Sequence, residues 1–262
     1  MRIVVLTKPV PDPASGGERL GPDGRLIRTA TPAVLNGNDE YALEAALKLT
    51  ERLGGEVTLL SMAPAGAPET LRKGLAMGAT RAVHVQDPAI EGSCTRSTAH
   101  VLAAALRTLE YDLVLAGADT SDGQAGVVAP AVATLLGLPY LSYAARIEPD
   151  PDTGRVRVRR LSPIGYDLLE APMPALIACT QVLGEPRYPT LKGIMAARSK
   201  ELLGRSLADL DLGGAGVGVA ASANRLVESH PPAPRPPTQV LRGAPQDSAA
   251  AIVSFLESRR VI

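Results

Sequence analysis

Short aliphatic runs alternate with helix-forming segments along residues 1–145, and this alternation constrains the fold more than any other feature of the chain. Each run is rich in Val, Leu or Ile, which is typical of strands buried on both faces of a parallel sheet. The predicted strands are residues 3–7, 57–62, 82–85, 113–116 and 140–144. Strands that alternate with helices indicate a doubly wound, mostly parallel α/β sheet.

The helices between these strands have recognisable start and stop signals. The first helix has Asn38 or Asp39 as a candidate N-cap and Gly54–Gly55 as its stop. Its apolar stripe consists of Tyr41, Leu43, Ala46, Leu47 and Leu49. Further helices are predicted from Pro68 to about Gly78, from Ser97 to Leu109, and from about Ala125 to Leu136.

The pattern changes after the fifth predicted strand. Residues 155–161, RVRVRRL, alternate charged and apolar side chains, which favours an antiparallel strand with one solvated face over a nucleic-acid patch. The turn DPDTG joins this segment to Arg146–Ile147, so the pattern predicts a hairpin added to the sheet. Residues 175–179, ALIAC, are predicted to form another buried strand.

The C-terminal segment is expected to form an arm. Residues 231–237 are rich in proline and predict a linker. In the helix that follows, Ile252, Val253, Phe255 and Leu256 share one face. A lone helix of this length is marginal in water, so it needs a partner surface in this chain or another. The predicted organisation is an α/β domain over residues 1–230 and an arm over residues 231–262.

Charge and composition argue against several function classes. The formal net charge is zero, which disfavours a broad basic field for nucleic acid or a membrane. The two cysteines are far apart, which disfavours a disulfide framework or a metal site. The first apolar run is too short for a signal peptide, and no run reaches the ~20 residues that span a bilayer, so we expect a cytoplasmic protein. The three histidines are scattered, which favours binding over side-chain catalysis.

The segment 112–130, DLVLAGADTSDGQAGVVAP, predicts a strand, a loop of small and polar residues, and the start of a helix. Such a helix start offers free N–H groups and a positive dipole end to a phosphate. Gly123 and Gly126 allow close approach, Thr120 and Ser121 offer hydroxyls, and Asp122 is a candidate cap. A plain capped helix explains this segment equally well, and neither a Rossmann nor a P-loop motif is present.

Two other loops follow predicted strands at the same edge of the sheet. Leu6 closes the first strand and Met62 the second, while residues 36–39 open the first helix. Because ligands of open α/β sheets bind beyond the carboxyl ends of the strands, the three loops should converge on one crevice. This supports a bound adenine nucleotide and a fold of the adenine-nucleotide-binding type, although many α/β proteins bind no nucleotide.

Five stretches, in order along residues 1–205, resemble the β subunit of electron-transfer flavoproteins. They are IVVLTKPVPD, LNGNDEYALEAALKL, APETLRKGLAMGATRAVHV, AGADTSDGQAGVVAPAVATLLGLP and GEPRYPTLKGIMAARSKEL. The last is the most specific, because it resembles the family's dehydrogenase-recognition loop. The resemblance implies an electron carrier rather than an enzyme. It also implies a larger α subunit that holds or shares a redox-active FAD, with acyl-CoA and other dehydrogenases as electron donors and a quinone oxidoreductase as acceptor.

The resemblance also implies a ligand for the loop. Ordinary members of the family bury a structural AMP in the β subunit, and electron-bifurcating members hold a second FAD at the same site. The loop here retains Asp122–Gly123 but lacks the full D-G-D-T-A-Q-V string of bifurcating members, so AMP is favoured. A stand-alone nucleotide-binding protein of the stress type is a third interpretation.

By position, the resemblance assigns two sets of site residues. The AMP contacts fall on Leu6, Asn36, Gly37, Asn38, Asp39, Met62, Gly117, Ala118, Asp119, Thr120, Ser121, Asp122, Gly123, Gln124, Ala125, Gly126, Val127 and Val128. The recognition loop falls on residues 185–200, with Leu191 as its anchor and Lys192, Ile194 and Met195 beside it. Pro13 stands where some members place a Tyr near the flavin, so that contact does not carry over. The arm, 231–262, is expected to pack on the α subunit.

Overall fold

The structure is a computed structural model that describes residues 1–262 except 17, 29–30, 229, 231–232 and 236. Its strands are β1 (Arg2–Leu6), β2 (Pro9–Pro11), β3 (Ala33–Leu35), β4 (Glu56–Met62), β5 (Arg81–Val85), β6 (Leu113–Gly117), β7 (Tyr140–Asp150), β8 (Arg155–Ser162), β9 (Gly165–Pro172), β10 (Ala175–Cys179) and β11 (Leu202–Arg205). Its α-helices are α1 (Gly37–Leu53), α2 (Ala67–Met77), α3 (Thr95–Arg107), α4 (Val128–Leu136), α5 (Leu191–Ala197) and α6 (Pro245–Ser258). Chain contacts divide it into two units, Met1–Leu226 and Val227–Ile262.

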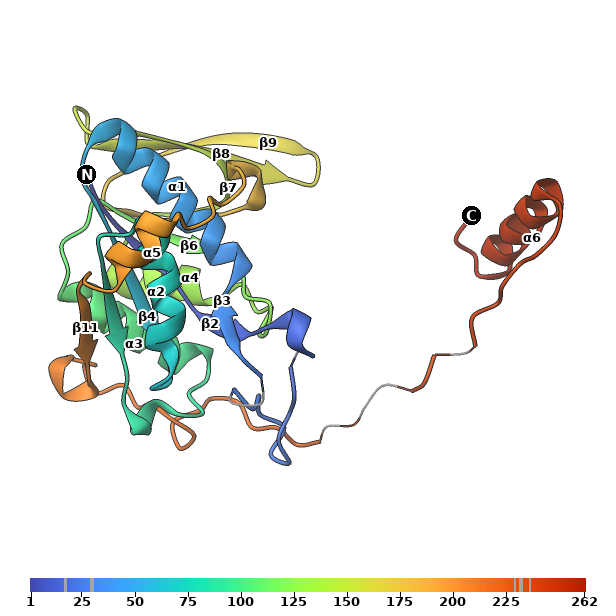
Figure 1. Ribbon diagram of the computed structural model, residues 1–262, viewed down its shortest axis with the longest axis horizontal. Helices are drawn as coiled ribbons and strands as arrows, with labels where there is room; N and C mark the ends of the chain where they lie inside the picture. The colour runs from blue at the N-terminus through green and yellow to red at the C-terminus, as the bar shows by residue number, and fades with distance from the viewer. Residues whose placement is uncertain (17, 29–30, 229, 231–232, 236) are drawn as a thin grey trace. The chain divides into compact units, whose positions relative to one another are not determined.

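The aliphatic runs form the centre of a nine-stranded sheet in the described part of the chain, in the order β11-β5-β4-β1-β6-β10-β7-β8-β9. The neighbouring strands from β11 to β7 all pair parallel. Strand β8 pairs antiparallel with β7 and with β9. Figure 1 shows helices α1 to α4 of the first unit packed against these strands. The predicted fold class, a doubly wound and mostly parallel α/β sheet with an antiparallel addition, is confirmed.

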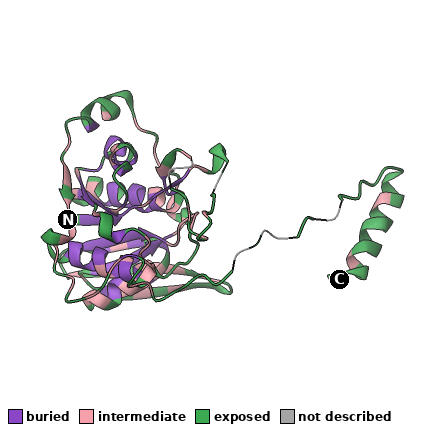
Figure 2. Cartoon of the chain, turned by 90° about the horizontal axis from the view of Figure 1, so that it is seen from below, coloured by how far each residue is buried: buried purple, intermediate pink, exposed green. Residues whose placement is uncertain are grey.

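The core lies on both faces of this sheet because alternate residues of each strand point in opposite directions. Ile3 and Val5 of β1 pack on the face covered by α1, whereas Val4 and Leu6 pack on the face covered by α3 and α4. Figure 2 shows the resulting buried centre of the first unit. The aliphatic stripe predicted for the first helix is buried at Leu43, Ala46, Leu47 and Leu49.

The antiparallel addition is larger than the sequence predicts. The predicted fifth strand and the first arm of the hairpin are one strand, β7, which pairs with β10 at its start and with β8 after it. The strand bends at Tyr143, whose φ is 50°. Strand β9 was not predicted, because GYDLLEAP lacks a clean alternation of polar and apolar residues. Strand β11, LLGR, is too short to give a pattern.

Three further predictions are corrected in the described structure. Part of the proline-rich loop after β1 forms β2, which pairs antiparallel with β3. Helix α4 begins at Val128 rather than near Ala125. The segment 185–200 contains the helix α5, because Thr190 caps it by accepting a hydrogen bond from the N–H of Gly193 at 3.0 Å.

The unit Val227–Ile262 is described by itself. Its helix α6 begins at Pro245 and has no buried residue within this structure. Ile252, Val253 and Phe255 are each about half exposed. Three of the linker prolines, residues 231, 232 and 236, lie outside the described residues. Among the described helices, none combines the length and apolar character that crossing a membrane requires.

Candidate functional site

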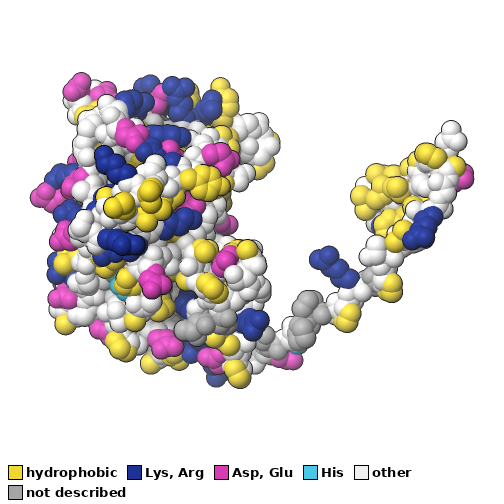
Figure 3. Space-filling model, in the orientation of Figure 1, with side chains coloured by type: hydrophobic (Ala, Val, Ile, Leu, Met, Phe, Trp, Pro, Cys, Tyr) yellow, Lys and Arg dark blue, Asp and Glu magenta, His cyan; other side chains and the backbone are white. Residues whose placement is uncertain are grey.

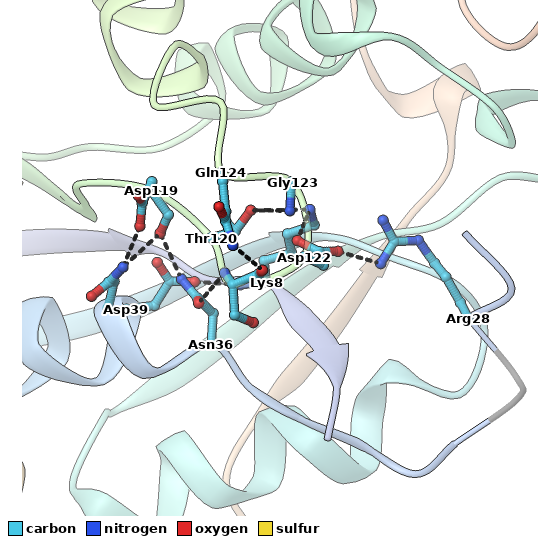
Figure 4. Close-up of polar contacts among 11 residues, drawn as sticks. Lys8, Arg28, Asn36, Asp39, Asp119, Thr120, Asp122, Gly123 and Gln124 are labelled. Carbon is cyan, nitrogen blue, oxygen red and sulfur yellow. Dashed lines mark hydrogen bonds and ion pairs between the residues drawn. The ribbon is translucent and has the colours of Figure 1, made fainter. Parts of the chain in front are cut away.

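The candidate site lies where the strand order reverses. Strand β1 is flanked by β4 on one side and by β6 on the other. The chain therefore leads from β1 to α1 on one face of the sheet and from β6 to α4 on the other face. That divergence is where open α/β sheets bind ligands. The N-terminus of α1 and residues 118–127, here called the β6–α4 loop, meet at this edge (Figure 4).

Two asparagines tie the β6–α4 loop to the start of α1. Asn36 is 1% exposed, and its Nδ2 donates to the carbonyl of Asp119 at 2.9 Å, while its Oδ1 accepts from the N–H of Ser121 at 3.2 Å. Asn38 Nδ2 donates to the carboxylate of Asp119 and to its carbonyl at 3.4 Å. The prediction that Asn38 or Asp39 caps α1 is wrong. The N-cap position is Asn36. The side chains of Asn38 and Asp39 instead bind segments outside α1.

Asp39 joins three segments beneath the loop. Its carboxylate is buried, and it accepts hydrogen bonds from the N–H of Lys8 at 2.8 Å and of Gly117 at 3.3 Å. A Cβ on Gly117 would lie 2.6 Å from Asp39 Oδ1 and 2.7 Å from the carbonyl carbon of Asn38, so only glycine allows this approach. Burial raises the pKa of Asp39 to about 7, although the hydrogen bonds to the carboxylate act in the opposite direction.

Asp122 has a different role from the one predicted. It does not cap α4; its carboxylate, 1% exposed, pairs with Lys8 Nζ at 2.7 Å and with Arg28 at 3.1 Å. Burial alone would raise its pKa, but the ammonium of Lys8 and the guanidinium of Arg28 outweigh burial and lower it. The pairs bring the loops after β1 and β6 together. Arg28 was not predicted as a site residue, because its loop has no periodic pattern.

The N-terminus of α4 is left open. Its N-cap residue, Val127, makes no capping side-chain hydrogen bond within the described structure. The preceding chain turns through Gln124, with φ 45°, and Gly126, with φ 62°. The first N–H groups of an α-helix have no partner within the helix, so this end can bind an anion.

Two buried hydroxyls at this edge also have no partner. The Oγ atoms of Ser121 and Ser61 are buried without a hydrogen bond to any described residue. A buried hydroxyl without a partner is unfavourable, and a polar ligand relieves that cost. The open helix end and the free hydroxyls fit the phosphate and ribose of a nucleotide.

The structure brings some predicted residues together and separates others. Asn36 and Asn38 contact the β6–α4 loop directly, and Asp39 contacts Gly117 at the end of β6. The side chains of Leu6 and Met62 pack instead against the core on the α3 and α4 side, so only their backbone lies at the edge. Gly123, Gln124, Ala125, Gly126 and Val127 are exposed. Among the described residues, no group of His, Cys, Asp and Glu could hold a metal ion.

The second candidate region is the exposed surface of α5. Leu191 is 75% exposed, Met195 66% and Ile194 46%, and their spacing places them along one side of the helix. Lys192 is exposed beside them. In Figure 3, hydrophobic side chains gather on the surface where Figure 1 places α5.

Polar contacts hold α5 against α2 and α1. Lys200 Nζ donates to the carbonyls of Leu75 at 2.9 Å and Ala79 at 2.7 Å, at the C-terminal end of α2. Arg187 Nε pairs with the buried Glu44 of α1 at 2.7 Å. Burial acts to raise the pKa of Glu44, but the guanidinium of Arg187 outweighs burial and lowers that pKa. The apolar side chains are therefore presented on a fixed support.

The titration of Asp39 gives a test of how the site is held. A carboxyl with a pKa of 3.8 when unfolded and about 7 when folded binds its proton more tightly in the folded protein. Its contribution to stability is present at acidic pH and is lost as pH rises to 7. We predict that the stability difference between wild type and Asp39→Asn changes by roughly 2 kcal/mol between pH 5 and 7, as the wild type loses stability. Urea unfolding across this range measures it, and parallel profiles would contradict it.

Comparison with known proteins agrees with this geometry. The family model described as the electron transfer flavoprotein domain matches residues 23–210. A protein of Clostridium acetobutylicum named electron transfer flavoprotein subunit beta is 35% identical over 263 residues, which cover 100% of both chains. A protein of the same name from Mycobacterium tuberculosis strain H37Rv is 38% identical over 235 residues, covering 87% of this chain and 88% of its own.

A third relative has a different name. A protein of Anaerotignum propionicum named acryloyl-CoA reductase electron transfer subunit gamma is 34% identical over 274 residues, which cover 100% of both chains. The similarities extend over the sheet, the β6–α4 loop and α5 alike. They confirm the resemblance identified from the five sequence stretches: the chain belongs to the electron-transfer flavoprotein β-subunit family.

Proposed function

We propose that this protein binds a structural AMP at the β6–α4 loop and carries electrons as a heterodimer with an electron-transfer flavoprotein α subunit. The nucleotide assignment is carried by the open N-terminus of α4, together with the unpartnered hydroxyl of Ser121 in the loop that leads to it. The α subunit holds or shares the FAD. Acyl-CoA and related dehydrogenases supply the electrons, and a quinone oxidoreductase accepts them.

The residues of the loop suit binding rather than bond chemistry. Lys8 and Arg28 each pair with Asp122, and Asp39 is occupied by two backbone N–H groups. Their charges are therefore committed to fixing the loop. The adenine nucleotide would lie against a rigid frame in which the first turn of α4 contacts the phosphate.

The name of one relative favours a second candidate. The Anaerotignum propionicum protein is named as the electron transfer subunit of a reductase that acts on a CoA ester. This favours a reductase of that kind as a partner. The bifurcating alternative, in which FAD replaces AMP at the β6–α4 loop, stays as the second candidate for the nucleotide. Co-expression with the α subunit, denaturation and mass spectrometry of the released nucleotides separate the two. One AMP and one FAD per heterodimer support the proposal, and two FAD without AMP support the alternative.

We also propose that the surface of α5 docks the dehydrogenase. A single buried leucine is worth about 1.5–3 kcal/mol, which orients a partner and still allows its release. The exposure of Leu191 supports this role. The polar contacts of Lys200 with α2 and of Arg187 with α1 fix the position of the helix. The C-terminal arm, with the apolar face of α6, is proposed to pack on the α subunit.

Ser121→Ala tests the nucleotide site without disturbing the fold. Since the hydroxyl has no partner among the described residues, its removal should not lower the thermal midpoint of unfolding of the nucleotide-free chain. Nucleotide retained by the purified heterodimer should fall several-fold, because the phosphate or ribose loses a hydrogen bond worth about 1 kcal/mol. Ser162→Ala, at the end of β8, is the matched control. Equal nucleotide content in Ser121→Ala and wild type would count against the site.

Leu191→Ala tests the docking surface. The side chain is exposed, so folding, flavin content and heterodimer formation should be unaffected. Electron transfer from an acyl-CoA dehydrogenase should fall at least several-fold, while reduction by dithionite remains normal. Leu53→Ala, at the end of α1, is the control for an exposed leucine elsewhere. If the dehydrogenase-coupled rate equals that of wild type, Leu191 is not the anchor.

Deletion of residues 232–262 tests the arm. The apolar face of α6 is uncovered within the described unit, so its loss should remove contacts with the α subunit and leave the first unit folded. Size-exclusion chromatography of the truncated chain with the α subunit should show weakened association. A heterodimer as stable as that of the full chain would contradict the proposal that the arm packs on the α subunit.

A further inference from the structure

The three antiparallel strands β7, β8 and β9 carry an apolar surface that the proposed sites do not use. It consists of Tyr143, Leu161, Ile164, Tyr166 and Leu168, which are 54%, 36%, 98%, 62% and 67% exposed. We refer to these five residues as the β8–β9 patch. Scattered exposed apolar residues are ordinary on a protein surface, but a contiguous group marks an interaction site.

The strand register places the five side chains together. Leu161 pairs with Tyr166 across β8 and β9, and the chain between them turns at Ile164. Leu168 lies two residues beyond Tyr166, on the same face of β9. Ala144 pairs with Arg160, so Tyr143 and Leu161 each lie next to a paired residue, in β7 and in β8. The patch therefore lies at the end of the β8–β9 hairpin, with Tyr143 on the neighbouring strand.

The opposite face of the same strands is already buried. Val156 and Val158 are 0% exposed, and Ala171 is 6% exposed, within the core that also contains α1. Burial of one face is sufficient for an antiparallel sheet, whose other face is normally polar. The second apolar face is not required by the fold of this chain. Tyr143 also has φ 50°, a strained conformation for an aromatic residue, and such strain is concentrated at functional positions.

The charged side chains beside the patch on the outer face of β8 and β9 are three arginines and one glutamate. Glu170 accepts from Arg155 at 2.6 Å and from Arg157 at 3.0 Å, and the guanidinium of Arg159 lies 5.4 Å from the ring centre of Tyr166. Figure 3 shows Lys and Arg side chains gathered where Figure 1 places β8 and β9, and all those on β7–β9 are arginines. Arginine and tyrosine are enriched in protein interfaces and lysine is depleted.

The outer edge of β9 strengthens the argument for permanent cover. Strand β9 is the last of the sheet, and no strand of the described chain pairs with its outer edge. It has eight residues and two large exposed apolar side chains. Such an edge promotes aggregation unless something covers it at all times. A dehydrogenase that docks and leaves does not provide that protection.

We propose that the β8–β9 patch and the outer edge of β9 are covered by the α subunit in the heterodimer. This inference rests on the pairing in the proposed function and adds the surface through which it occurs. Three strands of this length span about 26 Å by about 14 Å. That projected area is roughly half of the ~800 Å² that each partner contributes to a stable interface. The face can therefore supply up to about half of such an interface, and the remainder would come from other surfaces such as the arm.

The test uses the full chain with Tyr166→Glu and Leu168→Glu combined. Both side chains are exposed, so the free subunit should retain its circular dichroism spectrum and thermal midpoint. Its Kd for the α subunit, measured by titration calorimetry, should rise at least tenfold above that of wild type. Leu53→Glu, an apolar-to-acidic change on α1, should bind as wild type does. Tyr166→Ser with Leu168→Ser replaces the acidic pair if that pair does not fold.

Three outcomes overturn the inference. If the variant binds the α subunit as tightly as wild type, the patch is not the interface. If the heterodimer is intact but dehydrogenase-coupled reduction falls, the patch belongs to the dehydrogenase. If the heterodimer is intact but light scattering shows that the variant alters self-association of the free β chain, the patch belongs to a second copy. Failure of the wild-type chain to bind the α subunit would instead refute the proposed function.

Discussion

The site depends on the side chains at the start of α1 that reach across to the loop after β6. Asn36 and Asn38 hold Asp119 and Ser121, and Asp39 holds the N–H groups that follow β1 and end β6. Residues far apart in sequence are thus joined at one edge of the sheet. Their close approach requires a glycine at position 117, where any Cβ would collide with α1. Because these polar groups serve the loop, α1 has no side-chain cap within the described residues.

The same arrangement divides the edge into a charged part and a neutral part. Lys8 and Arg28 both pair with Asp122, so this cluster fixes the loop and retains one net positive charge. The neutral part consists of the open first turn of α4 and the hydroxyl of Ser121. Backbone N–H groups and a helix dipole favour a phosphate without a dedicated lysine. This explains how a loop with neither a Rossmann nor a P-loop motif suits a nucleotide.

The sequence predicts most of the parallel sheet, because aliphatic runs such as Val57–Met62 report burial on both faces. It does not predict which side chains cap a helix and which bind a distant loop. Asp122 and Asn38 have good capping chemistry, yet tertiary pairing with Lys8 and Asp119 determines their roles. Strand β9 was missed because adjacent leucines at positions 168 and 169 interrupt its alternation, although they point to opposite faces. The same alternation, once the register is known, identifies the exposed β8–β9 patch.

The central claim is that the first turn of α4 receives the phosphate of an adenine nucleotide. Hydrogen–deuterium exchange of the nucleotide-stripped heterodimer, with and without added AMP, tests it most directly. The account predicts slower exchange at the amides of residues 125–129 and of Ser121, with no change in β8 or α5. If AMP protects no amide of the β6–α4 loop, or protects only a segment elsewhere, the nucleotide does not bind where the structure leaves these groups open.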